Sequence, residues 1–367
     1  SWIDAMADPF KLLVLPGDGI GPEVVSAALR VFEKLCRLEQ IETEIQHDLL
    51  HGAAWERYGS FCRDETVASA KQSDALLIGA VGGAQWDNLP PDGATPAERD
   101  GLMRMREELQ TYACLRPSRA YESLLIRTPF RPEVVVGADI LVLRELCGGL
   151  PYGTPRGIDK LDDGSFQAYD ANFYSSEEIR RCAVVGFEVA AGRRGKLTSI
   201  DKSNVMESGI LWRRIVSETG ADYPAIELEH LYADNALYQM MLRPTDFDVV
   251  LADNIFGDLA SDLVASYAGS LGMLPSASLC GLNSGKPAIY EPVHGTAPDI
   301  AGQGIANPIG TILSVAMMFE YSMQRKDLAR RIENAVEQCL LAGVLSADLG
   351  GNASTDQVCE QILSALN

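Results

Sequence analysis

Hydrophobic positions along the chain fall into two alternating patterns: short unbroken runs, and longer runs with a helical period. Unbroken apolar runs at 11–15 (KLLVL) and 74–81 (DALLIGAV) predict strands that are buried on both faces. Residues 23–38, which follow a proline suited to the first turn of a helix, predict an amphipathic helix. Strands that alternate with helices are typical of layered α/β folds, whose functional groups gather at the carboxyl ends of the strands.

The same two patterns continue through the rest of the chain. Further extended or strand segments are expected over 112–116, 134–143, 197–201, 226–232 and 248–252. Further helices are expected over 102–109, 175–191, 205–219, 235–242, 256–268, 308–324, 327–342 and 356–365.

One segment breaks this pattern. Residues 153–174 alternate polar and aromatic side chains around Asp163-Gly164, which predicts a hairpin with a tight turn. The hairpin is too polar to be buried in a core, so we expect it to project from the body and to pair with a second subunit.

Composition narrows the class of protein. A chain of 367 residues with 47% hydrophobic content can form two domains or one large α/β unit. No apolar run reaches the roughly 18–20 residues that a membrane span needs. Residues 1–10 lack the basic and apolar regions of a signal peptide and are left out of the fold prediction. The formal net charge of −20 argues against nucleic acid or an anionic membrane as a partner.

Cysteine usage bears on the cellular setting. The eight cysteines are scattered along the chain without a CxxC pair. This spacing favours reduced, mostly buried thiols over a disulfide framework or a zinc site. The expected localisation is therefore cytoplasmic.

Positive charge is unevenly distributed along the chain. Between positions 72 and 159 there are nine arginines and no lysine. Arginine binds carboxylates with a planar, bidentate geometry that lysine lacks. About half of these arginines are expected to be ordinary partners in surface ion pairs. The others indicate a small ligand that carries several negative charges.

Two aspartates, Asp258 and Asp262, follow the buried strand near 249–252. On a helix they would share one face, where like charges repel by roughly 0.2–0.5 kcal/mol. A hard divalent cation would turn this repulsion into binding, because Mg²⁺ prefers carboxylate oxygens. The alternative is a solvated acidic helix start, with Asp258 favoured by the helix dipole. The local sequence does not favour one over the other.

Five segments with chemical character occur along the chain. The first, 16–23 (PGDGIGPE), is a glycine-rich loop of the kind that can bind phosphate, although its glycines do not match GxGxxG. The five are 16–23, 144–149, 201–205, 254–262, and 291–302 with 306–308. Together they resemble the β-decarboxylating dehydrogenases of the isocitrate and isopropylmalate type, over nearly the whole chain from Lys11.

This resemblance implies an α/β, two-lobed, non-Rossmann fold with a projecting hairpin arm at a dimer interface. The first lobe would contain 1–111 and 269–367 and most cofactor contacts. The second lobe, 112–268, would carry the dimer interface, the arm, the catalytic lysine and the metal-binding aspartates. The implied assembly is a homodimer with shared active sites.

The resemblance also implies a reaction. It would be the NAD-dependent oxidative decarboxylation of (2R,3S)-3-isopropylmalate to 4-methyl-2-oxopentanoate and CO₂, a step of leucine biosynthesis, or the same reaction on a related 3-substituted malate. One alternative is a dehydrogenase for another malate, such as an aryl-substituted one. The other is a catalytically impaired relative that serves as a regulatory or structural partner.

Family positions assign the reacting groups. Lys202, together with Asp234 from the partner subunit, matches the base that takes the proton of the substrate hydroxyl. The alternative for Lys202 is a solvated lysine at a strand end. Asp234, Asp258 and Asp262 match the ligands of Mg²⁺ or Mn²⁺, which would stabilise the enolate as CO₂ leaves.

Substrate contacts follow from the same resemblance. The positions that match carboxylate-binding residues are Arg106, Arg116 and Arg144, with Asp234 beside them. Leu102 and Met103 match contacts to the substituent on C3 of the substrate. Both are apolar, which fits an alkyl or aryl group better than the third carboxylate of isocitrate.

Cofactor contacts are implied mainly by the segment that begins at 291. The matching positions are Gly83, Asn204, Glu291, His294, Gly295, Thr296, Ala297, Pro298, Asp299, Ile300 and Asn307. Asp299 decides the choice of cofactor, because its carboxylate can accept hydrogen bonds from both ribose hydroxyls and would repel a 2′-phosphate. NAD is therefore expected in preference to NADP.

One position departs from the family pattern. Pro151 stands where the family has a tyrosine that helps to protonate the enol, and proline has no acidic proton to give. Tyr152 is the adjacent replacement and the third candidate catalytic residue. On a strand it would point to the opposite face unless the backbone bulged.

Overall fold

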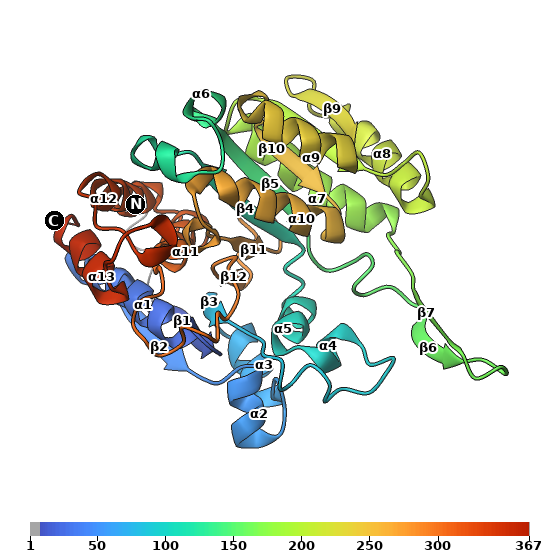
Figure 1. Cartoon of the computed structure of the whole chain (residues 1–367), viewed down its shortest axis with the longest axis horizontal. Helices are drawn as coiled ribbons and strands as arrows, with labels where there is room; N and C mark the ends of the chain where they lie inside the picture. Colours follow the sequence, from blue (N-terminus) through green and yellow to red (C-terminus); the bar gives the residue numbers. More distant parts are fainter. Residues whose placement is uncertain (1–7, 367) are drawn as a thin grey trace.

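The computed structural model describes residues 8–366, through which one sheet of ten strands extends (Figure 1). In spatial order the strands are β2 (Thr43–His47), β1 (Phe10–Gly17), β3 (Ala75–Ala80), β12 (Ala288–Tyr290), β11 (Ala277–Leu279), β4 (Ala113–Arg119), β5 (Asp139–Glu145), β10 (Val249–Ala252), β8 (Lys196–Asp201) and β9 (Glu227–Tyr232). The first four are mutually parallel, and so are the last four. Three antiparallel pairings, β12–β11, β11–β4 and β4–β5, join the two groups.

Helices connect and cover the strands. They are α1 (Gly21–Leu38), α2 (Gly52–Tyr58), α3 (Asp64–Lys71), α4 (Pro96–Arg99), α5 (Gly101–Leu109), α6 (Pro132–Val135), α7 (Ser176–Ala191), α8 (Glu207–Gly220), α9 (Ala233–Leu242), α10 (Asn254–Ala265), α11 (Ile309–Tyr321), α12 (Lys326–Leu341) and α13 (Thr355–Ser364). Short 3₁₀ turns are η2 (Glu122–Arg127), η3 (Pro244–Asp246), η4 (Ser266–Ala268), η5 (Leu271–Met273) and η6 (Ala347–Leu349). Across residues 8–366, no helix is both long and apolar enough to cross a membrane.

Alternate residues of each strand enter different hydrophobic cores. Leu141 and Leu143 of β5 point into a large core shared with α7, α8, α11 and α12. Ile140 and Val142 of the same strand point into a second core, with α9 and α10. At the other end of the sheet, β1 divides its apolar residues in the same way between the α1 and α5 sides. Helices therefore cover both faces, as the unbroken apolar runs predict.

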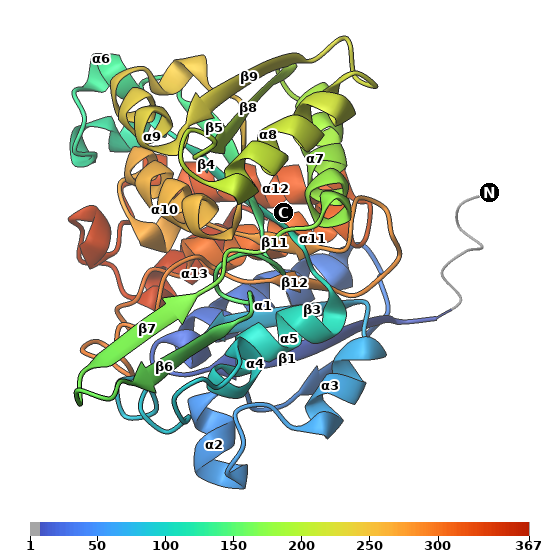
Figure 2. The ribbon, with the colours of Figure 1, turned by 90° about the vertical axis from the view of Figure 1, so that its right-hand side faces the viewer.

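The predicted hairpin is confirmed. Strands β6 (Arg156–Lys160) and β7 (Phe166–Asp170) pair in antiparallel fashion (Figure 2) and extend away from the body of the molecule (Figure 1). All of β7 is exposed, and Phe166 is 68% exposed. Its pairing with a second subunit stays a prediction.

The strand expected over 134–143 is wrong at its start. Pro132–Val135 forms the short helix α6, and Gly137 has a φ of 80° before β5 begins at Asp139. A proline in the first helical turn and a glycine in the left-handed region override the apolar run. The elements β2, α2, α3, β11 and β12 were not predicted; the last two have three residues each, which is too short to show a period.

Candidate active site

Arg116 on β4 and Arg144 on β5 converge on one carboxylate of α10, that of Asp258. Arg116 donates hydrogen bonds to Asp258 Oδ1 at 3.2 Å and to the Ser261 hydroxyl at 2.7 Å. Arg144 donates to the same Asp258 oxygen at 2.5 Å. The two arginines are only 4% and 8% exposed, whereas the side chain of Asp258 is 49% exposed. Two buried cations therefore share one accessible carboxylate, which leaves positive charge for an anionic ligand.

Arg106 on α5 completes this cluster electrostatically. It is 7% exposed and donates to Glu291 Oε1 at 2.8 Å. Burial lowers the pKa of Arg144 to about 10, with further lowering by the charge of Arg116 and a smaller effect of Arg106. The structure thus brings together the three arginines that the sequence predicts for substrate carboxylates, and Arg144 remains a cation at neutral pH.

Helix α10 positions the two candidate metal-binding carboxylates. Its N-cap is Asp253, whose side chain accepts a hydrogen bond from the Phe256 amide at 2.8 Å, which weakens the alternative that Asp258 serves the helix start. Burial, and then the charge of Asp258, raise the pKa of Asp262. A carboxylate destabilised by a like-charged neighbour is a donor that fits a hard divalent cation.

Lys202, which follows β8, forms an ion pair with Asp234 in the first turn of α9. The hydrogen bond from Lys202 lowers the pKa of Asp234. This pair lies within one chain, which differs from the expectation that Asp234 reaches Lys202 from the partner subunit. Within residues 8–366 no three acidic, histidine or cysteine side chains form a group that could hold a metal, so Asp234 does not join Asp258 and Asp262 in one chain.

Tyr152 lies in a turn instead of on a strand, so the rule of alternating faces does not apply to it. Its hydroxyl lies 3.4 Å from the Met103 carbonyl oxygen and 3.6 Å from Met103 Sδ. Arg106 Nη1 also lies 3.6 Å from Met103 Sδ. Burial raises the pKa of Tyr152, and the nearby charge of Arg106 opposes this rise. The turn therefore places the tyrosine hydroxyl against Met103, which also contacts Arg106 of the arginine cluster.

The two apolar residues predicted to contact the C3 substituent differ in their surroundings. Leu102 is packed in the core between α5 and the sheet, together with Met105 and Leu109. Met103 is half-buried and faces Tyr152 and Arg106. Met103 is therefore the more accessible of the two.

A buried polar network holds Arg144, and the sequence did not assign it a function. Asn254 Oδ1 accepts hydrogen bonds from Arg144 Nε at 3.1 Å and Nη2 at 2.7 Å, and Asn254 Nδ2 donates to the Gly148 carbonyl at 2.9 Å. The Glu145 carboxylate accepts from the Gly148 amide at 2.9 Å, and burial raises its pKa to about 7. The Tyr174 hydroxyl accepts from the Asn254 amide at 3.0 Å. The network fixes the guanidinium of Arg144 relative to α10.

Asp18 is a second buried acid whose function the sequence did not indicate. Its carboxylate accepts hydrogen bonds from the amides of Gly52 at 3.1 Å, Ala53 at 2.8 Å and Gly82 at 3.0 Å. It thereby ties the glycine-rich 16–23 loop to the loop that contains Gly83. In the sequence, the only indication of this function was the position of Asp18 between two glycines that follow a predicted strand.

The candidate cofactor loop rests against the 16–23 loop. The Ile20 amide donates to the Thr296 carbonyl at 2.9 Å, and a Cβ on Gly19 would come within 2.1 Å of that oxygen. Ala297 and Ile300 pack on the apolar side of Ile20. Gly295, Pro298 and Asp299 are exposed at the rim of the loop.

Three polar groups near this loop are candidates for binding a dinucleotide cofactor. Nε2 of His294 and Oε2 of Glu291 are buried without a hydrogen-bond partner in the described part of the chain. The Asp299 carboxylate is exposed. Unsatisfied buried polar atoms call for a partner, and the nitrogen and hydroxyl groups of an adenosine can supply one. These residues therefore fit the expected cofactor.

Two other predicted cofactor residues are placed differently. Asn307 is buried and engaged inside the protein, where it donates to Asp348 Oδ2 at 3.0 Å and accepts from the Ile309 amide at 3.0 Å. Asn204 is exposed in the turn after β8, close in sequence to Lys202. Asn307 therefore supports the start of α11, and Asn204 lies with the lysine end of the site.

The sheet, the arginine cluster and the carboxylate pair define an α/β enzyme class for anionic substrates, and sequence comparison identifies the family. The isocitrate/isopropylmalate dehydrogenase family matches residues 11–362, so the chain belongs to this family.

Individual relatives agree with this assignment. The chain is 46% identical to a 3-isopropylmalate dehydrogenase of Hydrogenovibrio crunogenus over 97% of this chain and 99% of the relative. It is 47% identical to one of Aquifex aeolicus, with 97% of each covered. Among solved structures, an isocitrate dehydrogenase from Methylococcus capsulatus has a TM-score of 0.85 at 30% identity, covering 97% and 99% of the two chains. A β-decarboxylating dehydrogenase from Thermococcus kodakarensis has a TM-score of 0.74 at 32% identity, covering 97% and 96%.

Proposed function

We propose that this protein oxidises and decarboxylates (2R,3S)-3-isopropylmalate to 4-methyl-2-oxopentanoate and CO₂ with NAD, as a step of leucine biosynthesis. The observation that carries the proposal is the convergence of Arg116 and Arg144 on Asp258, with Arg106 beside them. Buried arginines at this density suit the two carboxylates of a malate. The names of the relatives that match over nearly the full length support the same substrate.

The residues divide the chemistry between them. The arginine cluster binds and orients the substrate carboxylates, and Met103 meets the substituent on C3. Lys202, held in place by Asp234, accepts the hydroxyl proton during oxidation when its side chain is in the neutral amine form. Mg²⁺ or Mn²⁺ at Asp258 and Asp262 supplies positive charge that stabilises negative charge on the substrate during decarboxylation. Tyr152 returns a proton to the product carbon.

A comparison of substrates tests this function. We expect NADH formation with 3-isopropylmalate, and a kcat/KM at least about 100-fold lower with isocitrate, because an apolar pocket at Met103 leaves a third carboxylate without a partner. Aryl-substituted malates in the same assay test the alternative substrate class. If the protein binds NAD⁺ and Mg²⁺ but forms no NADH from any malate, the alternative of a catalytically impaired relative is supported instead. The Tyr152 hydroxyl beside Met103 argues against that alternative, because it is a candidate proton donor.

We further propose a homodimer whose active sites are shared. The arm is exposed, and α9 and α10 present Tyr238, Met241, Leu242 and Leu259 to solvent at 58%, 47%, 52% and 55% exposure. A second copy would bury these side chains. The lysine pair and the carboxylate pair lie apart in one chain, so the partner would supply Lys202 and Asp234 to the site of Asp258.

Mixing two inactive variants tests the shared site. Lys202→Gln and Asp258→Asn homodimers should each be nearly inactive. After the two are unfolded and refolded together, about half of the dimers are mixed, and each mixed dimer has one site with both residues intact. We expect recovery of about one quarter of the unmodified activity; refolding each variant alone is the control. No recovery in verified mixed dimers would mean that Lys202 and Asp258 act from the same chain.

Cofactor choice gives another prediction. The unmodified protein should prefer NAD⁺ to NADP⁺ by about 100-fold or more in kcat/KM, because the exposed Asp299 carboxylate repels a 2′-phosphate. Asp299→Lys should narrow this ratio by at least about tenfold, with Asp299→Asn intermediate because it removes repulsion without adding a cation. Equal use of both cofactors by the unmodified protein would contradict the assignment.

Two broader features accompany this function. We propose that 1–111 with 269–367 forms one lobe and 112–268 the other; the two parallel groups of strands, joined across β11 and β4, support this division. A cytoplasmic setting is supported by eight free cysteines, for several of which burial raises the thiol pKa, as for Cys62, to about 11.

A further inference from the structure

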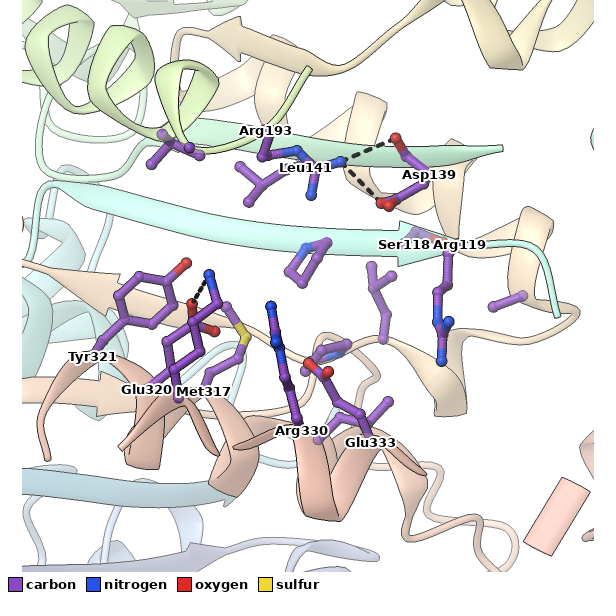
Figure 3. Close-up of a pocket in the computed structure, with 18 of the residues that line it drawn as sticks. Ser118, Arg119, Asp139, Leu141, Arg193, Met317, Glu320, Tyr321, Arg330 and Glu333 are labelled. Atoms are coloured by element: carbon purple, nitrogen blue, oxygen red, sulfur yellow. Dashed lines mark hydrogen bonds and ion pairs between the residues drawn. The ribbon is translucent and has the colours of Figure 1, made fainter. Parts of the chain in front are cut away.

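A cavity of about 510 Å³ lies on the side of β4 and β5 that faces away from α10 (Figure 3). Arg116 points to Asp258, whereas Pro117 and Arg119 on the same strand line the cavity. Helices α11 and α12 form the opposite wall, and α7 closes one side. The volume falls within the roughly 300–1,000 Å³ of small-molecule sites, and the cavity is separate from the candidate active site.

Two exposed, opposite charges on α12, those of Arg330 and Glu333, line this cavity. Arg330 and Glu333 are three residues apart on the helix, a spacing at which they could pair, yet neither forms a hydrogen bond or ion pair within residues 8–366. Figure 3 shows Arg330 rising from α12 into the cavity with Glu333 beside it. Glu188 on α7 is a further lining carboxylate without a partner in this part of the chain.

Other charges around the cavity are already engaged. The engaged pairs are Arg193–Asp139 at 2.9 Å, Lys326–Glu320 at 3.5 Å and Arg119–Glu337 at 3.4 Å. The groups left for a ligand are therefore one guanidinium and two carboxylates. A simple anion would meet the carboxylates, and a simple cation would meet the guanidinium. A ligand with both a carboxylate and an ammonium group satisfies both kinds of charge.

Apolar side chains form the floor between these charges. They come from both sides of the cavity and include Leu141, Val189, Met273, Leu313 and Met317. A bound ligand gains free energy by covering this surface, at about 25 cal/mol per Å² of apolar area. The floor therefore favours a zwitterion that also carries a large apolar group.

We propose that this cavity binds an α-amino acid with a large apolar side chain. Its carboxylate binds Arg330, its ammonium group binds Glu333, and its side chain lies against Leu313 and Met317. The site is independent of the proposed reaction, because none of these residues belongs to the arginine cluster or to the cofactor loop.

Calorimetric titration of the full chain, without malate or cofactor, tests the site. The probes are L-leucine, L-methionine and L-phenylalanine, with glycine as the control that lacks an apolar side chain. We expect one site per chain for at least one of the three and at least about tenfold weaker binding of glycine. The amine and the 2-oxo acid related to the best probe should also bind at least about tenfold more weakly, since each lacks one charged group.

Matched variants locate the binding. Arg330→Gln and Glu333→Gln should each weaken it at least about tenfold and change the melting temperature little, because both side chains are exposed and neither forms a hydrogen bond or ion pair within residues 8–366. Arg331→Gln is the control, since Arg331 pairs with Glu39 outside the cavity, and it should keep the affinity. Absence of binding by all three amino acids at about 10 mM, or binding that survives either cavity substitution, would overturn the proposal.

Discussion

Replacing Asp258 with asparagine should lower turnover roughly 10²–10³-fold and weaken the dependence of the rate on Mg²⁺. An amide is a poorer ligand for a hard cation than a carboxylate. The substitution also removes the negative charge that Arg116 and Arg144 share, at 3.2 Å and 2.5 Å. Steady-state rates measured across a Mg²⁺ titration give both effects.

The melting temperature, which does not depend on activity, distinguishes a role of Asp258 in metal binding from its role as counter-charge to the arginines. Mg²⁺ should raise the melting temperature of the unmodified protein, because a ligand bound only by the folded state stabilises it. Asp258→Asn should lose this shift, and Asp258→Glu, which keeps the charge, should retain part of it. If Asp258→Asn keeps both the unmodified rate and the metal requirement, then Asp258 serves only as the counter-charge of the two arginines.

The sequence predicted those parts of the site that lie on single regular elements. Asp258 and Asp262 share a helix face because four residues make about one turn, and Arg144 ends a strand that the apolar run marks. Arg116 comes close to Arg144 through pairing of β4 with β5, where Cys114 lies opposite Arg144. That pairing joins segments 30 residues apart (144 − 114), and no local pattern fixes its register.

Residues that act through distant contacts could not be predicted in the same way. Asn254 binds Arg144 across 110 residues of sequence, and Tyr174 reaches the Asn254 amide across 80. Asp18 was visible only as part of a glycine-rich loop, because its partner Gly82 lies 64 residues away. The direction of Tyr152 could not be predicted, because the alternation of faces holds only on a strand and the chain turns there.

Because Pro151 replaces the family tyrosine, Tyr152 is the candidate donor of the final proton. Tyr152→Phe should lower steady-state turnover about 10²–10⁴-fold, the usual contribution of a general acid, because its hydroxyl lies against Met103, which also contacts Arg106. Lys202 and the aspartates are unchanged, so oxidation should persist. Rapid mixing should show a burst of about one NADH per site followed by slow turnover. Tyr58→Phe, at an exposed tyrosine on α2, is the control that loses a hydroxyl elsewhere.

Restoring the family tyrosine tests the same idea from the opposite direction. Pro151→Tyr in the Tyr152→Phe background should recover part of the lost rate, and the turn should tolerate it because Arg156 binds the backbone carbonyl of residue 151 and not its side chain. In the unmodified background the gain should be small, since Tyr152 already supplies the proton. A large gain there, with no loss in Tyr152→Phe, would mean that water is the donor in the unmodified protein.

The pH dependence gives a further check on Tyr152 as the acid. Burial raises its pKa above the ordinary value of 10, so the hydroxyl keeps its proton throughout the neutral range. A general acid is active in its protonated form, and the rate should therefore show no loss that is due to Tyr152 until the pH exceeds about 10. A loss of rate that begins near pH 8 in the unmodified protein and persists in Tyr152→Phe would belong to another group. If that loss disappears in Tyr152→Phe, the hydroxyl ionises in the neutral range, and it could not remain the proton donor.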